Sequence, residues 1–177
     1  MERTGVLEHH NVIRNGISFE LKVFPNVWCM PEHEFCTNVL DLMYKYRDQI
    51  KNSCVLDVGT GSGLMSIYAS LLGAKETLAL DIQSESVQCA IENTKKYHNI
   101  SVIEHDFRSG IENTYGIIIA NLPLVVQGME LHRLLPNMDK NSLMFLTNYS
   151  DFQPKGFEII DKILGKECDG FVLRRNQ

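Results

Sequence analysis

The sequence predicts an α/β fold built on a doubly wound, mostly parallel sheet of seven strands, with an antiparallel C-terminal hairpin and a separate N-terminal β-hairpin. Two observations predict this class. Short apolar runs typical of buried strands alternate with amphipathic runs at helical spacing, as βαβ units require. In addition, the run Val55–Gly63, VLDVGTGSG, places a glycine-rich turn between a strand and a helix, where a ligand can lie directly on the main chain.

The N-terminal part predicts a β-hairpin and then a helix. Val12–Val23 alternates around Asn15-Gly16, the dipeptide that best accepts the positive φ angles of a two-residue turn. A loop with two prolines follows, and beyond it apolar residues recur at helical spacing. We expect one domain of 177 residues, in which 1–31 form the hairpin and pre-helix loop and 32–177 form the core.

The rest of the chain alternates strands with helices. The expected strands are 55–58, 77–80, 100–104, 115–120 and 143–147, and the expected helices are 64–72, 84–98 and 128–135. The last two apolar runs, 157–164 and 168–174, must pair antiparallel, because a parallel crossover needs about a dozen residues. The stretch 148–156 is too short for the helix that such folds usually carry there. We expect an apolar surface that a second copy or a partner subunit would cover.

Composition limits the partners and the compartment. Lys and Arg total 17 against 22 Asp and Glu, and the resulting net charge of −5 argues against nucleic acid as the main partner. The five cysteines contain no CxxC pair, which is typical of a reducing compartment. No stretch has the apolar run of a signal peptide or a membrane span. We therefore expect a cytoplasmic protein with no membrane partner.

Four candidate ligand-binding segments follow the ends of consecutive predicted strands. The glycine loop comes first, and Asp81 ends the second strand, where its carboxylate can accept both ribose hydroxyls of an adenosine. After the third strand, Asp106 and Phe107 can contact the adenine, and Asn121 ends the fourth strand. Each segment also has a purely structural explanation: a tight turn, a helix start, a solvated acid and a turn residue, respectively.

VLDVGTGSG, LALDI and IIANLPL resemble the motifs of class I S-adenosylmethionine-dependent methyltransferases, over roughly residues 25–175. The aspartate two residues before the first glycine distinguishes the first motif from the GxGxxG of dehydrogenases. The resemblance implies a Rossmann-like fold with an added antiparallel last strand. It also implies S-adenosylmethionine as the cofactor, with its methionine part held by the loop and its ribose by Asp81. Ile82, the next residue, is a further expected cofactor contact. The loop residues concerned are Asp57, Gly59, Thr60, Gly61 and Gly63.

Two branches of that family are similar in more detail. The segment VWCMPEHEF is similar to VYEPAEDTF of release-factor glutamine methyltransferases and retains Glu32 and Phe35. IIANLPL is also similar to a motif of ribosomal-protein methyltransferases, which lack the NPPY of the first branch. The resemblance implies catalytic roles for Asn121 and Pro123, with Asn121 also near the cofactor. Leu124 replaces the tyrosine of NPPY and offers no π-face, so a flat base is a less suitable substrate.

The leading hypothesis is methyl transfer to a nitrogen of a protein side chain. Methylation of a small molecule and a non-catalytic, cofactor-binding partner subunit stay open as alternatives. Trp28 either covers the ligand or anchors the pre-helix loop. His33 lies between Glu32 and Glu34, but consecutive residues at a helix start point in different directions. We therefore expect no metal site.

Overall fold

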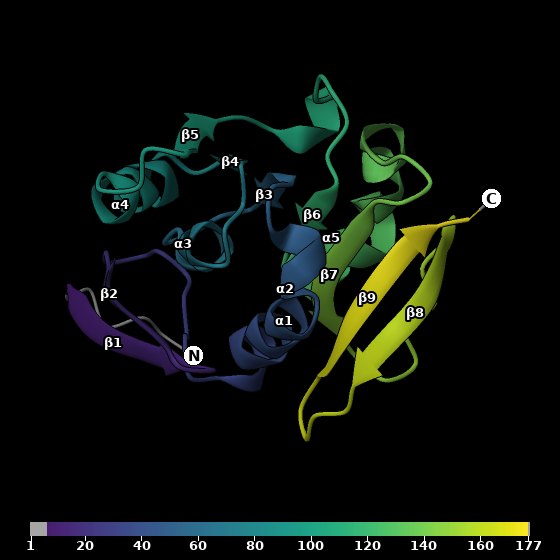
Figure 1. The fold of residues 1–177 in the computed structure, drawn as a ribbon, viewed down its shortest axis with the longest axis horizontal. Coiled ribbons are helices and arrows are strands. Elements are labelled where there is room, and N and C mark those ends of the chain that lie inside the picture. Colours follow the sequence, from purple (N-terminus) through teal and green to yellow (C-terminus); the bar gives the residue numbers. More distant parts are fainter. Residues whose placement is uncertain (1–6, 177) are drawn as a thin grey trace.

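The computed structural model describes residues 7–176, apart from the side chains of Leu124 and Val125. Its centre is a seven-stranded sheet in the order β5-β4-β3-β6-β7-β9-β8 (Figure 1). The first five strands in this order pair parallel, and β9 pairs antiparallel with both β7 and β8. The predicted sheet and its antiparallel C-terminal hairpin are therefore confirmed. The strands are β3 (Cys54–Val58), β4 (Glu76–Asp81), β5 (Ile100–Glu104), β6 (Ile117–Ile119), β7 (Leu143–Asn148), β8 (Phe157–Ile163) and β9 (Asp169–Arg175).

The N-terminal hairpin forms a two-stranded sheet of its own, β1 (Glu8–Arg14) and β2 (Ile17–Val23). Asn15 and Gly16 have φ angles of 52° and 80°, the positive pair that a two-residue hairpin turn of this type requires. Leu21 is buried in the core that the hairpin shares with the helices beside it. The hairpin predicted from the Asn-Gly dipeptide is confirmed.

Helices cover both faces of the large sheet, as a doubly wound fold requires. On one face, a core cluster joins α1 (Glu34–Lys45), α3 (Leu64–Leu71) and one residue of α4 (Ser84–Thr94), and the short α2 (Arg47–Ile50) follows α1. On the other face, a second cluster gathers the 3-10 helices η1 (Phe107–Ser109) and η2 (Leu131–Asn137). A seventh helix of the described chain, α5 (Leu124–Glu130), directly precedes η2.

The helix expected over 128–135 begins earlier than predicted and is divided. α5 already begins at Leu124, directly after Pro123, and η2 continues from Leu131. A proline suits the start of a helix because the N–H that it lacks would have no partner there. Pro136 within η2 likewise removes a donor that an α-helical ladder would use. Gly128, taken as the start, instead lies inside α5.

The segment between β7 and β8 is a short loop, as its length predicted. Phe152 of this loop packs edge to face on Phe171 of β9, with ring centroids 5.5 Å apart. This aromatic contact helps to bury Phe171. Tyr149, in the same loop, is 58% exposed. The proposed second copy or partner subunit stays a prediction.

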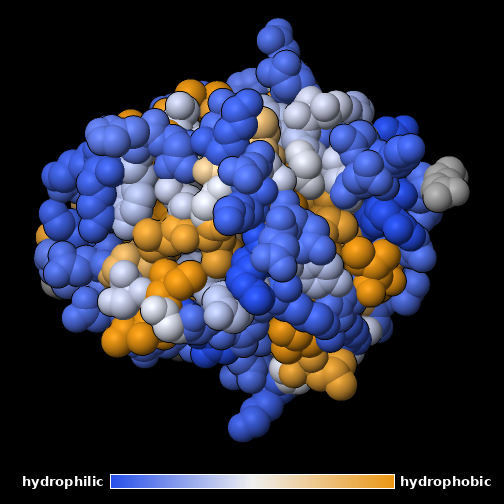
Figure 2. Space-filling model, viewed as in Figure 1, coloured by the Kyte–Doolittle hydropathy of each residue, from blue (hydrophilic) through white to orange (hydrophobic). Residues whose placement is uncertain are grey.

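The face of the molecule seen in Figure 1 is mostly hydrophilic. Figure 2 shows blue residues over most of the face seen in Figure 1, with hydrophobic residues exposed in separate patches. Within residues 7–176, none of the helices combines the length and the apolar character that crossing a bilayer requires.

The order of the strands determines where a ligand can bind. From β3 the chain passes outward to β4 and β5 and then returns to β6 on the opposite side of β3. The connections that leave β3 and β6 therefore diverge, and in open α/β sheets the resulting crevice at the carboxyl ends of the strands is the usual ligand site. All four predicted ligand-binding segments lie at this edge.

Candidate functional site

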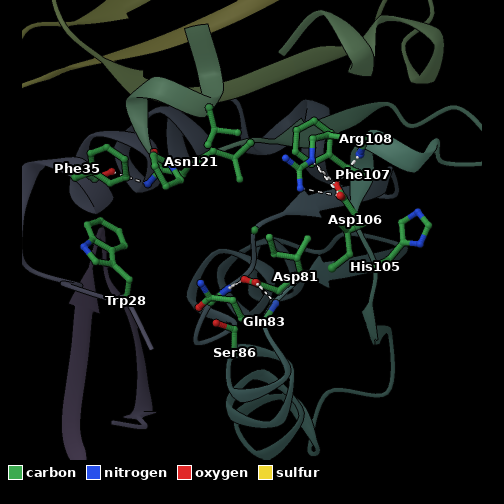
Figure 3. A pocket seen from close by; sticks show the side chains of 17 residues that line it. Trp28, Phe35, Asp81, Gln83, Ser86, His105, Asp106, Phe107, Arg108 and Asn121 are labelled. Carbon is green, nitrogen blue, oxygen red and sulfur yellow. Dashed lines mark hydrogen bonds and ion pairs between the residues drawn. The ribbon is translucent and has the colours of Figure 1, made fainter. Parts of the chain in front are cut away.

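A cavity of about 500 Å³ lies at the carboxyl ends of β3, β4, β5 and β6. Two groups of residues face each other across it (Figure 3). The Asp81 side consists of Gly61, Asp81, Ile82, Gln83, Ser86, His105, Asp106 and Arg108. The Asn121 side consists of Trp28, Phe35, Asn121, Leu122, Pro123 and Val126. Gly59, Leu80 and Phe107 complete the lining.

Most of the predicted site residues line this cavity, but three do not. Gly59, Gly61, Asp81, Ile82, Asp106, Phe107, Asn121 and Pro123 belong to the lining. Asp57, Thr60 and Gly63 lie in the same loop without belonging to it, and all three are buried. These three residues lie on the core side of the loop and help to fix its conformation. Leu124, whose replacement of tyrosine bears on the substrate, has a side chain outside the described part of the structure.

The glycine loop packs tightly against other walls of the cavity. Gly59 and Gly61 have φ angles of 72° and 56°, which side chains rarely adopt. A Cβ on Gly59 would lie 2.4 Å from Cδ2 of Leu122, and one on Gly61 would lie 3.0 Å from the carbonyl oxygen of Trp28. These glycines therefore let the loop approach two segments that are distant in sequence.

Asp57 supports the loop from inside the core. Its carboxylate accepts hydrogen bonds from the hydroxyls of Thr60 at 2.8 Å and Ser66 at 2.6 Å, and only 2% of the residue is exposed. Burial raises the pKa of Asp57 to about 6, although both hydroxyls act in the opposite direction. Asp57 thus joins the loop to the first turn of α3.

Asp81 presents a carboxylate that is fixed but not saturated. Its Oδ2 accepts the N–H of Gly61 and its Oδ1 accepts the N–H of Gln83, each at 3.0 Å. A carboxylate has about four acceptor positions, so each oxygen keeps capacity for another donor. The two backbone donors come from the loops after β3 and β4, which explains why glycine loop and acid occur together. Asp81 can therefore accept two further hydroxyl groups.

The carboxylate of Asp106, unlike that of Asp81, is paired with an arginine side chain. Arg108 donates to both of its oxygens through Nε, at 2.8 and 3.0 Å, and through Nη2 at 2.8 Å. The backbone N–H of Arg108 adds a fourth contact at 3.0 Å. The guanidinium lowers the pKa of Asp106. Phe107 is buried with its ring in the core below. A ligand can bind Asp106 only by displacing Arg108.

Asn121 is bound to the protein at both ends of its amide. Nδ2 donates to the carbonyl oxygen of Phe35 at 2.7 Å, and Oδ1 accepts from the hydroxyl of Thr147 at 2.8 Å and from its N–H at 3.2 Å. The neighbouring carbonyl of Leu122 accepts a hydrogen bond from Nε2 of Gln127 at 2.7 Å. The side-chain oxygen of Asn121 therefore has both acceptor positions used, whereas the carbonyl of Leu122 keeps one of two.

An aromatic pair forms the outer wall on the Asn121 side. Trp28 meets Phe35 edge to face, with ring centroids 4.8 Å apart and an interplanar angle of 81°. Trp28 is 43% exposed, so its ring reaches solvent at the edge of the cavity. Trp28 therefore both lines the cavity and anchors the pre-helix loop on Phe35, and the two explanations left open by the sequence are compatible.

Several residues of the site carry no motif signal. Gln83, Ser86, His105, Arg108 and Val126 line the cavity because they follow strand ends or begin helices, a position that sequence alone indicates only loosely. Thr147 and Gln127 lie behind the lining and are fully buried. Thr147 is indistinguishable in sequence from any residue at the end of a buried strand.

Comparison with known families decides between the branches that the sequence suggested. The family model described as "Ribosomal protein L11 methyltransferase (PrmA)" matches residues 32–141, more than half of the chain. The chain belongs to the ribosomal protein L11 methyltransferase family. The resemblance to class I methyltransferases is thereby confirmed, on its ribosomal-protein branch.

Individual members of the ribosomal protein L11 methyltransferase family support the assignment. The protein of that name from Lactobacillus acidophilus is 39% identical over 105 residues, which cover 58% of this chain and 32% of that relative. The chain thus spans about a third of the length of the first relatives it matches. A crystal structure of ribosomal protein L11 methylase from Lactobacillus delbrueckii subsp. bulgaricus has a TM-score of 0.74 and 25% identity, covering 88% of this chain and 84% of that one.

The fold is shared more widely than the family. A tRNA m1G37 methyltransferase from M. jannaschii has a TM-score of 0.76 at 21% identity, covering 97% of this chain and 57% of that one. At this identity the likeness concerns the fold alone. In this member of the L11 methyltransferase family, the cavity at the switch point of the sheet is therefore built on a widely shared scaffold.

Proposed function

We propose that this chain binds S-adenosylmethionine in the cavity and transfers its methyl group to a nitrogen of a protein side chain. The carboxylate of Asp81 is the observation that carries the proposal. Two backbone N–H groups fix it beside the glycine loop and leave an acceptor position on each oxygen. This arrangement suits the two ribose hydroxyls of a nucleoside, and the chain belongs to a family of methyltransferases.

The remaining cofactor contacts would come from the same edge of the sheet. The main chain at Gly59 and Gly61 would hold the methionine part, with Asp57, Thr60 and Gly63 keeping the loop in shape. Ile82, which is 54% exposed and lines the cavity, would pack on the nucleoside. Asp106 would bind the adenine amino group once Arg108 moves, and Phe107 would lie beneath the ring.

The methyl acceptor would enter on the Asn121 side. When bound, the cofactor supplies an electrophilic methyl group on a sulfonium. Asn121 and Pro123 would border the path of the incoming nitrogen, with Trp28 and Phe35 forming its outer wall. The main task of these residues is to hold the acceptor in line and exclude water, because alignment alone can lower such a barrier by roughly 7–11 kcal/mol.

A protein acceptor is favoured by the names of the relatives, which refer to ribosomal protein L11. We therefore propose a ribosomal protein as the substrate and the cytoplasm as the place of reaction. The net charge of −5 agrees with an acceptor that is not nucleic acid. Methylation of a small molecule is the second candidate, because the 500 Å³ cavity is large enough for one beside the cofactor's reactive end.

Methyl-labelled S-adenosylmethionine tests the proposal directly. The purified protein would be incubated with ribosomal protein L11, and separately with protein, nucleic-acid and small-molecule fractions of a cell lysate. We expect label in protein, and in L11 above all. Label confined to small molecules or to nucleic acid would contradict the acceptor class. Cofactor binding without label in any fraction would contradict catalysis and favour the partner-subunit alternative.

A further inference from the structure

A buried hydrogen-bond network behind the cavity fixes the side chain of Asn121. Thr147, at the end of β7, is fully buried and does not line the cavity. Its N–H and its hydroxyl both donate to Oδ1 of Asn121, at 3.2 and 2.8 Å. The same hydroxyl lies 3.2 Å from the carbonyl oxygen of Phe35, which accepts from Nδ2 of Asn121 at 2.7 Å. The start of α1, the segment after β6 and the end of β7 are therefore joined through the side-chain amide of Asn121.

The orientation of the Asn121 amide follows from the polarity of its backbone partners. The carbonyl of Phe35 can only accept, and the N–H of Thr147 can only donate. A flipped amide would place two acceptors together at Phe35 and two donors together at Thr147. The orientation is thus determined by the fold. Both lone pairs of Oδ1 are used, and the second N–H of Nδ2 is the group of this amide with no partner inside the network.

The network extends to the backbone that follows Asn121. Gln127 is 1% exposed, and its Nε2 donates to the carbonyls of Leu122 at 2.7 Å and Thr147 at 2.9 Å. Oε1 of Gln127 accepts from Asn148 at 2.9 Å. Thr147 is therefore connected to the segment after β6 twice. Its hydroxyl binds the side chain of Asn121, and its carbonyl binds Gln127, which in turn binds the carbonyl of Leu122.

We propose that Thr147 is a positioning residue for the acceptor side of the cavity, an inference that rests on the proposed function. Its hydroxyl reinforces the orientation that the backbone partners give the Asn121 amide, and so limits the movement of this wall of the cavity. Through Phe35 the same network holds the ring against which Trp28 packs. Thr147 does not line the cavity and has no hydrogen bond to the Asp81 side, so its loss should alter the transfer of the methyl group more than the binding of the cofactor.

Two substitutions at position 147 and one control separate positioning from stability. Thr147→Val keeps the shape and removes the hydroxyl, whereas Thr147→Ser keeps the hydroxyl. Thr77→Val is the matched control, because Thr77 is an equally buried strand residue whose hydroxyl has no hydrogen-bond partner. Each protein would be compared for S-adenosylhomocysteine binding, methyl transfer at saturating cofactor, thermal unfolding and acrylamide quenching of Trp28, the sole tryptophan.

We expect Thr147→Val to lower the transfer rate about tenfold, which corresponds to the loss of one internal hydrogen bond. S-adenosylhomocysteine affinity should stay within about twofold of wild type, and Trp28 should become easier to quench. Thr147→Ser should restore most of both properties, and Thr77→Val should change neither.

Wild-type transfer rate and quenching in Thr147→Val would overturn the inference, as would a serine variant impaired as much as the valine variant. Failure of the wild-type protein to bind S-adenosylhomocysteine would instead refute the proposed function. In that case the quenching comparison still tests whether Thr147 holds the aromatic wall.

Discussion

The two sides of the cavity use their polar groups in opposite ways. On the Asp81 side, the carboxylate is fixed by two backbone donors and keeps acceptor positions for a ligand. On the Asn121 side, both acceptor positions of the amide oxygen are filled by Thr147, and the carbonyl of Leu122 accepts a hydrogen bond from Gln127. The carboxylate on the first side therefore keeps free acceptor positions, whereas the amide on the second side is bound mostly to other groups of the protein.

This difference indicates where binding energy and where alignment would come from. A nucleoside has many polar groups, and a wall with spare acceptors can bind them. A methyl acceptor needs chiefly a defined path to the methyl group, and a rigid wall of Trp28, Phe35 and Pro123 can provide one. The contrast leads to four predictions, ordered by the size of the expected effect.

The largest effect is expected where the two sides touch. Gly59→Ala would place a Cβ 2.4 Å from Leu122 at a φ of 72°, combining a strained backbone with overpacking. We expect the free energy of unfolding to fall by roughly 2–5 kcal/mol, measured by urea denaturation. Gly110→Ala is the control, because Gly110 has a φ of 92° with no atom near its Cβ position. Equal losses in both variants would mean that the two sides are not in essential contact at Gly59.

Asp57, which supports the glycine loop, should make the folded protein less stable as the pH rises, the reverse of the usual effect of an aspartate. Because the folded-state pKa of Asp57 is raised to about 6 from 3.8, the folded protein holds this proton more tightly than the unfolded chain. Its contribution to stability is complete below about pH 4 and is lost as the pH rises to about 6, in total roughly 3 kcal/mol.

Asp57→Asn removes this titration. The stability of wild type minus that of the variant, measured by urea unfolding at several pH values, should therefore fall between about pH 4 and 6 and then level off. A difference that rises with pH over this range would show that Asp57 is stabilised in its charged form, contrary to its buried setting.

The ligand-binding face of the Asp81 side is tested by Asp81→Ala. We expect S-adenosylhomocysteine to bind about 100-fold more weakly, because two hydrogen bonds to a charged acceptor are lost. Isothermal calorimetry would measure the affinity of both proteins for S-adenosylhomocysteine. Asp139→Ala is a matched control, since Asp139 also accepts two backbone N–H groups, from Asn141 and Ser142, but does not line the cavity. Unchanged affinity in Asp81→Ala would exclude Asp81 as the ribose acceptor.

The smallest effect on ligand affinity is expected at Asp106, which follows β5. Asp106→Ala should weaken S-adenosylhomocysteine by only about threefold, because Arg108 already occupies the carboxylate and must be displaced. Arg108→Ala frees Asp106 and should strengthen binding by a similar factor, in the same calorimetric assay. Much weaker binding in both variants would indicate that Arg108 itself contacts the ligand.

Sequence predicted the fold and the Asp81 side well for a physical reason. The strand, glycine turn and acid at Val55–Gly63 and Asp81 are local signals, because each lies at the end of its own strand and strand ends meet at one edge of the sheet. The hairpin turn at Asn15-Gly16 is equally local. The start of α5 was missed because Gly128 suggested a boundary that Pro123 in fact provides.

The Asn121 side could not be predicted in the same way. Whether an asparagine faces a substrate or the protein depends on partners 86 and 26 residues away along the chain, Phe35 and Thr147. No local pattern indicates such contacts. The engagement of Asp106 by Arg108 is close in sequence, but an exposed acid and arginine two residues apart are too common to predict an ion pair.

Hydrogen–deuterium exchange of the wild-type protein, with and without S-adenosylhomocysteine, tests the contrast between the two sides most directly. We predict slower exchange at 59–63 and 81–83, which border the cavity and would be covered by the ligand, and no change at 143–148, which lies in the sheet behind the cavity. Protection at 143–148 without protection at 59–63 and 81–83 would contradict this account.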